Sequence, residues 1–85
     1  MKNIHYNCVG TCSECIDIVL DDEDRVVSAV FTGGCNGNLQ GIAKLVRGMP
    51  RQEVIDRLSG ISCNGGPTSC PDQLARALSQ PSRRM

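Results

Sequence analysis

The chain has 85 residues, and its nine basic and nine acidic side chains cancel. This balance argues against nucleic acid and anionic membranes as partners, because proteins bind both through an excess of Lys and Arg. The sequence shows neither a secretory signal nor a stretch of transmembrane length, so we expect a cytoplasmic protein.

The composition predicts one domain with a small aliphatic core. Only Tyr6 and Phe31 are aromatic and there is no Trp, so the interior must be built from Val, Ile, Leu and Ala, which bury less area per residue. At this length a hydrophobic core is often supplemented by a metal ion or by disulfides. We expect the domain to cover residues 1–80, and residues 81–85 to form a disordered tail.

The first part of the chain predicts three short strands. Residues 3–8, 15–20 and 25–32 each alternate apolar with polar side chains, as half-buried strands do. Asp and Glu fill positions 21–24, so the second and third strands are expected to form a hairpin. The apolar face carries Ile4, Tyr6, Cys8, Ile16, Ile18, Leu20, Val27, Ala29 and Phe31.

The second part of the chain predicts three helices. After Gly33-Gly34 the apolar spacing becomes helical and continues to Gly48, a second short helix begins near Pro50, and a third begins at Ser69 with a capping-box spacing. The apolar stripes of these helices carry Leu39, Ile42, Ala43, Val46, Val54, Ile55, Leu58, Leu74, Ala75 and Leu78. The order of elements indicates an α+β fold: a three-stranded antiparallel sheet followed by three helices packed on one face.

The six cysteines are the main candidates for chemistry. They stand at positions 8, 12, 15, 35, 63 and 70. Thiols are kept reduced in the cytosol, which favours metal binding or redox chemistry over structural disulfides.

Four cysteines from four regions could form one site. Cys35 and Cys70 stand where helices are expected to begin, and helix N-termini stabilise thiolates. Cys12 belongs to a CxxC motif, and Cys63 lies in a glycine-rich loop with six residues between it and Cys70. We therefore predict Cys12, Cys35, Cys63 and Cys70 as ligands of zinc or of an iron–sulphur cluster, between which the sequence does not distinguish. Cys8 and Cys15 are expected to be spare or auxiliary.

Several alternatives remain open. Cys63 and Cys70 could instead act as a redox dithiol, or all the cysteines could be inert in an interaction module. Residues 33–41 resemble a glycine-rich phosphate cradle for a nucleotide, but they lack the Lys-Ser/Thr of a P-loop and the GxGxxG spacing. His5 is expected to face solvent from a strand, and no catalytic residue set can be assembled. An exposed sheet edge would permit a homodimer.

The segment 68–72 spells Thr-Ser-Cys-Pro-Asp, the signature for which the TSCPD family is named. Residues 33–41 and 73–75 also resemble the small stand-alone members of that family. TSCPD domains occur fused to adenosylcobalamin-dependent ribonucleotide reductases, so the resemblance implies a link to ribonucleotide reduction and DNA synthesis. The chain is too short to contain that enzyme's catalytic barrel, which implies an accessory role. In such a role the dithiol would supply the reductase with reducing equivalents.

The order of elements also resembles the iron–sulphur scaffold proteins of the IscU type, which implies an IscU/SufE-like fold. Cys12, Cys35 and Cys70 stand where those scaffolds carry cysteines before a strand pair and at the starts of the first long helix and the last helix. Glu14 replaces an aspartate of the scaffolds, and Ser69 replaces a histidine. The resemblance implies a cluster-handling protein as partner, whereas the departures favour a permanently held metal.

Overall fold

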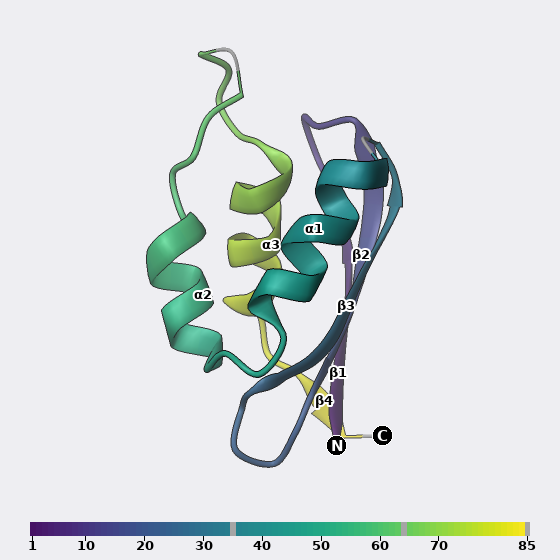
Figure 1. Cartoon of the computed structure of the whole chain (residues 1–85), viewed down its shortest axis with the longest axis vertical. Helices are drawn as coiled ribbons and strands as arrows, with labels where there is room; N and C mark the ends of the chain where they lie inside the picture. The colour runs from purple at the N-terminus through teal and green to yellow at the C-terminus, as the bar shows by residue number, and fades with distance from the viewer. Residues whose placement is uncertain (35, 64, 85) are drawn as a thin grey trace.

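The computed structural model describes residues 1–34, 36–63 and 65–84. A sheet forms one layer, and the helices cover one of its faces (Figure 1). The strands are β1 (Lys2–Asn7), β2 (Ser13–Leu20), β3 (Val26–Gly33) and the short β4 (Arg83–Arg84), in the spatial order β3-β2-β1-β4 with every pair antiparallel. The predicted three strands and the predicted α+β class are confirmed.

The alternation in β2 supplies the centre of the core. Ile16, Ile18 and Leu20 are at most 1% exposed, because successive side chains of a strand point to opposite faces of the sheet. The start of β3 differs from the prediction. An irregularity shifts the register there, so that Ser28 pairs with Val19 while Val26 pairs with Leu20. Val26 is therefore buried where we expected Val27, which is half-buried.

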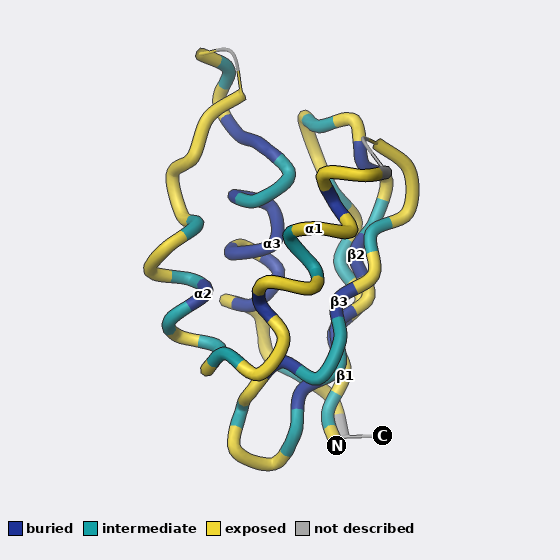
Figure 2. Tube along the Cα trace, viewed as in Figure 1, coloured by how far each residue is buried: buried dark blue, intermediate teal, exposed yellow. Residues whose placement is uncertain are grey.

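The helices are α1 (Asn36–Val46), α2 (Arg51–Leu58) and α3 (Cys70–Leu78). Helix α3 packs against β1 and β2, α1 packs against β3, and α2 packs against α3. Because α3 lies between the sheet and α2, it is the most buried of the three helices (Figure 2). No helix within the described ranges is both long and apolar enough to cross a lipid bilayer.

The C-terminal residues correct one expectation. Arg83 and Arg84 pair with Asn3 and Lys2, so β4 adds a fourth strand where a disordered tail was predicted. The physical reason is that β1 would otherwise be an edge strand with unpaired backbone groups, and the returning chain pairs with it at Lys2 and Asn3.

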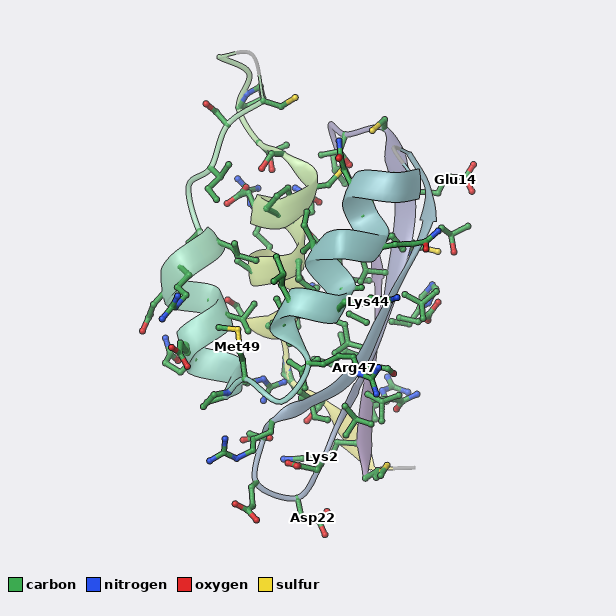
Figure 3. The ribbon with its side chains drawn as sticks, in the orientation of Figure 1. Lys2, Glu14, Asp22, Lys44, Arg47 and Met49 are labelled. Carbon is green, nitrogen blue, oxygen red and sulfur yellow. The ribbon has the colours of Figure 1, made fainter. Side chains whose placement is uncertain are left out.

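The two ends of the sheet differ in chemistry. At the end with the β2–β3 turn, the Lys2 ammonium bonds the Asp24 carboxylate and the N-terminal amine lies near Asp22. Figure 3 shows Lys2 and Asp22 gathered at this end. The opposite end carries the β1–β2 loop and the α2–α3 loop (Figure 1), and these two loops contain Cys12 and Cys63.

Candidate thiolate site

Three segments that are distant in sequence meet at one end of the molecule. The β1–β2 loop, the α2–α3 loop and the first turn of α3 line a cavity of about 380 Å³. Its wall is formed by Gly10, Thr11, Cys12, Cys63, Gly66, Pro67, Thr68, Ser69 and Cys70. Three of the four predicted ligands therefore face one cavity.

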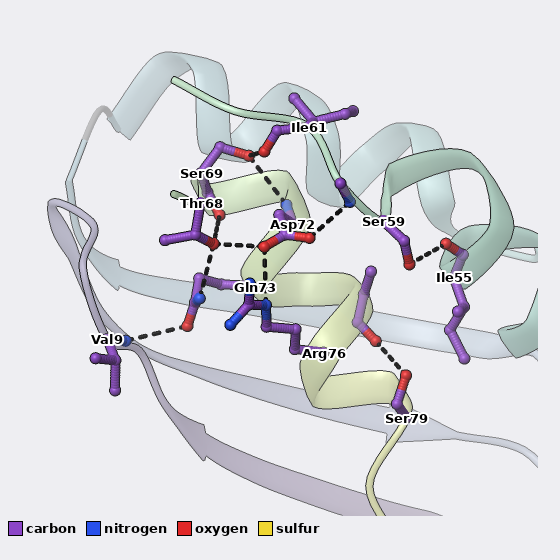
Figure 4. A network of polar contacts seen from close by, with 12 residues as sticks. Val9, Ile55, Ser59, Ile61, Thr68, Ser69, Asp72, Gln73, Arg76 and Ser79 are labelled. Atoms are coloured by element: carbon purple, nitrogen blue, oxygen red, sulfur yellow. Dashed lines mark hydrogen bonds and ion pairs between the residues drawn. The ribbon is translucent and has the colours of Figure 1, made fainter. Parts of the chain in front are cut away.

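The residues around Cys70 are fixed by a buried polar network (Figure 4). Thr68 donates from Oγ1 to Asp72 Oδ2 at 2.5 Å, and it accepts from Gln73 Nε2 at 2.9 Å. Gln73 Oε1 in turn accepts from the backbone N–H of Val9 at 3.0 Å. This chain of bonds attaches the β1–β2 loop to α3 and so holds the two loops of the site together.

Ser69 and Asp72 complete the network at the start of α3. Ser69 is the N-cap: its Oγ accepts from Asp72 N at 3.1 Å and donates to Ile61 O at 2.6 Å. The Asp72 carboxylate accepts from Gly60 N at 2.7 Å and pairs with Arg76 at 2.8 Å. The hydrogen bonds from Thr68 and Gly60, followed by the charge of Arg76, hold the Asp72 pKa below its usual value despite burial. Each of these bonds helps to fix the position of Cys70.

Cys70 lies among partners that favour its thiolate. Its Sγ is 3.0 Å from Ser13 Oγ and 3.9 Å from Cys12 Sγ. Burial opposes ionisation of Cys70, but hydrogen bonds from the side chain and backbone of Ser13, together with those from Cys12 and Thr11, bring its pKa below the ordinary value. Its position at the first turn of α3 adds the favourable field of a helix N-terminus.

Cys8 lies on the other side of Ser13. Its Sγ is 3.8 Å from Ser13 Oγ. Burial raises the pKa of the Cys8 thiol, and the hydrogen bond from Ser13 only partly offsets this effect. Of the two cysteines in contact with Ser13, Cys70 is therefore the better thiolate.

The β3–α1 junction also reaches this end of the molecule. Gly34 has φ of +79°, and a Cβ at this position would lie 3.2 Å from Cys12 Sγ and 3.0 Å from Leu39 Cδ1. A glycine is required here both for the backbone conformation and for the close contact. Cys35, the next residue and the fourth predicted ligand, lies outside the described residues.

The remaining predicted residues are placed as follows. Cys15 is not on the cavity wall but on β2, half-buried, where it forms a cluster with His5 and Asp17. Glu14, the scaffold-aspartate position, is exposed, and its side chain extends away from the helices (Figure 3). The geometry of Glu14 therefore does not suit a ligand of the cavity.

Sequence reasoning missed Ser13 and Thr11, which supply hydrogen bonds to Cys70. A serine between two cysteines of a CxxC motif carries no distinctive signal. The hydrogen-bond partners of Thr68 and Gln73 were also missed, since those contacts depend on how two loops meet in space.

The glycine-rich segment 33–41 borders a different cavity. A volume of about 510 Å³ lies between β3 and α1, beside Gly33, Gly34, Phe31 and Leu39. None of the described residues that line it carries a positive charge. Nucleotide binding stays a prediction without support from this geometry.

The fold and the site together define a small α+β domain that gathers thiols at one end. The TSCPD domain matches residues 3–81, so the chain belongs to the TSCPD domain family. No curated protein and no solved structure matches the chain. The similarity to IscU-type scaffolds therefore stays a prediction.

Proposed function

We propose that this protein binds a metal ion through cysteine thiolates at the cavity, with Cys12 and Cys70 as the central pair. The observation that carries the proposal is the 3.9 Å separation of their Sγ atoms. Tetrahedral zinc with bonds of about 2.3 Å to sulphur requires two ligand sulphurs about 3.8 Å apart. The two thiols thus fit one metal ion with little movement.

The surroundings of the pair suit a thiolate ligand. Metal binding requires the thiol to lose its proton, and the hydrogen bonds that Ser13 makes to Cys70 already favour that loss. The same hydroxyl would orient the sulphur of the bound thiolate, as outer-shell partners do in metal sites. The buried network of Thr68, Ser69 and Asp72 keeps Cys70 in place.

Cys63 and Cys35 are proposed as the remaining ligands. Cys63 lines the same cavity as Cys12 and Cys70, and Gly34, the sequence neighbour of Cys35, lies so near Cys12 that an added Cβ would be 3.2 Å from its Sγ. Two sulphurs on a single metal atom argue against a four-iron cluster, in which each cysteine binds a different iron, whereas a two-iron cluster holds two cysteines on each iron and would accept the same pair. The departures from the scaffold pattern at Glu14 and Ser69 favour a permanently held ion over such a cluster. Zinc is therefore the ion we propose, and an iron–sulphur cluster is the alternative outcome of the test.

Single substitutions test the ligand set. Cys12→Ser, Cys63→Ser and Cys70→Ser should each lower the metal content and the melting temperature, because the free energy of binding a structural metal contributes to folding. Cys8→Ser is the matched control, since Cys8 is a nearby cysteine that the proposal leaves without a metal. Full metal content and unchanged melting in the Cys70→Ser protein would contradict the proposal.

The same geometry favours a second candidate function, a redox dithiol. Cys12 contacts Cys70 and Cys70 has a lowered pKa, so a disulfide between these two residues is the redox pair that the structure supports. The predicted Cys63–Cys70 pair shares only the cavity wall. Reduction of a Cys12–Cys70 disulfide by thioredoxin in metal-free protein would support this function. A metal ion that always occupies these two thiols, and so prevents the disulfide from forming, would exclude it.

We further propose an accessory role beside a ribonucleotide reductase or a cluster-handling protein. This proposal rests on two resemblances of the sequence, to the TSCPD domains that occur fused to ribonucleotide reductases and to the IscU-type scaffolds. Specific co-purification with such a partner, abolished by Cys70→Ser but not by Cys8→Ser, is the expected result.

A further inference from the structure

The face of the sheet that points away from the helices carries a second group of metal-ligating side chains. His5 on β1 pairs directly with Asp17 on β2, and Cys15 lies two residues before Asp17 on the same strand. Residues separated by two positions share a face of a strand, so all three side chains stand on the outer face. Ile16 and Ile18, which alternate with them, are buried under the helices.

We propose that His5, Cys15 and Asp17 bind a second divalent transition-metal ion, with zinc as the preferred ion, independently of the thiolate site at the cavity. The possible ligand atoms of the three residues all lie within 4.8 Å of one another. His5 Nδ1 is 2.6 Å from Asp17 Oδ1. Imidazole nitrogen, thiolate and carboxylate form a donor set that zinc accepts with tetrahedral geometry.

The sheet brings these ligands together without the metal. β2 is a central strand with β1 on one side and β3 on the other, so backbone pairing fixes the spacing of the three Cβ atoms. Ligands held on paired strands lose little freedom when an ion binds. The metal would take the place of the proton between His5 and Asp17, so binding should release protons and lengthen that contact.

The exposure of the group indicates an open site. The side chains of His5 and Asp17 are 55% and 56% exposed, which leaves room for an ion to enter. Three protein ligands with water in the remaining position is the arrangement of open zinc sites, whereas closed structural sites have four protein ligands. Asn7 and Thr32, which pair with Cys15 on either side, are uncharged and would not repel a cation.

Cys15 distinguishes this proposal from a simple surface ion pair. His5 and Asp17 alone would form an exposed pair that contributes little to stability. The thiolate of Cys15 adds a third, softer donor and a second negative charge, which together select a transition-metal ion. Substitution of Cys15 is therefore the decisive variant.

The only histidine of the chain provides a direct readout. Zinc is titrated into Cys12→Ser/Cys70→Ser protein at mildly alkaline pH, and the imidazole signals of His5 are followed by ¹H–¹⁵N NMR. We expect these signals to shift with saturable binding. Cys15→Ser and Asp17→Asn should each weaken that binding by about tenfold or more, since loss of outer-shell partners alone costs that much. Asp56→Asn, at an exposed position of α2, is the control that should leave the binding unchanged.

Two outcomes would overturn the proposal: imidazole signals that do not move in excess zinc, and a Cys15→Ser variant that binds as tightly as its parent. If the double variant does not fold, the wild-type chain is titrated beyond its first equivalent of zinc with the same readout. Because the signal comes from His5 and not from the cavity cysteines, its failure leaves the thiolate-site proposal untouched.

Discussion

Ser13 lies between two cysteines whose thiol pKa values are shifted in opposite directions, upward for Cys8 and downward for Cys70. Its hydroxyl contacts Cys70 at 3.0 Å and Cys8 at 3.8 Å, and its hydrogen bonds are the main cause that lowers the Cys70 pKa against the effect of burial. Ser13→Ala should therefore raise the Cys70 pKa and shift its alkylation rate to higher pH, measured on metal-free protein by mass spectrometry. Ser79→Ala, which removes a hydroxyl at the far end of α3, is the control. An unchanged pH profile for Cys70 would show that Ser13 does not stabilise the thiolate.

Asp72 should stabilise the fold in a pH-dependent way. Because its folded pKa is lowered, its contribution is fully present above the unfolded value of about 3.9 and is lost as the pH falls through the lower folded pKa. Asp72→Ala should cost about 1–3 kcal/mol near neutral pH, since it leaves buried donors unsatisfied. Urea unfolding across the acidic range measures both effects, with exposed Asp56→Ala as control. Equal losses of unfolding free energy in Asp72→Ala and Asp56→Ala would contradict a stabilising role for the buried polar network.

At the scale of elements, the β3–α1 junction should be intolerant of a side chain. Gly34→Ala introduces a Cβ at φ of +79°, close to Leu39 and Cys12, and a left-handed conformation alone costs a non-glycine residue about 1–2 kcal/mol. Gly41→Ala is the matched control because Gly41 lies within α1 with open space around it. That change should stabilise the fold by about 0.5–1 kcal/mol. Gly34→Ala should lower both stability and metal content, and a neutral result in both measurements would contradict this account of the junction.

Most elements could be predicted because local patterns determine them. The alternation of Ile16, Ile18 and Leu20 and the capping residue Ser69 each act within a few neighbouring positions. The irregularity that buries Val26 in place of Val27 depends on the partner strand. The pairing of β4 with β1 also depends on a contact between the two ends of the chain, so neither feature could be read from local sequence.

At the scale of the whole molecule, the chain gathers its chemistry by tertiary folding. The sequence predicted that Cys12, Cys63 and Cys70 would converge, and the structure places all three on one cavity wall. It did not predict that Cys12 would be in contact with Cys70, because that depends on how the β1–β2 loop meets α3. It also predicted that His5 would face solvent but missed its neighbours Cys15 and Asp17, since strand register sets that contact.

The two clusters lie in different parts of the fold. The thiolate site is at the end of the sheet beside the first turn of α3, whereas the His5 cluster is on the open face of β1 and β2. Their separation means that each can be removed without changing the ligands of the other. A metal count on suitable variants can therefore assign each ion to its site.

Elemental analysis of anaerobically purified protein tests the central claim most directly. Zinc, iron and acid-labile sulphide are measured per chain in the wild type and in the Cys12→Ser/Cys70→Ser variant, together with a thiol count. The account predicts bound zinc without sulphide in the wild type and a loss of one ion per chain in the variant. Iron with sulphide would change the assignment from zinc to a cluster at the same cysteines. Metal-free wild-type protein with six reactive thiols, or equal metal content in both proteins, would contradict the claim.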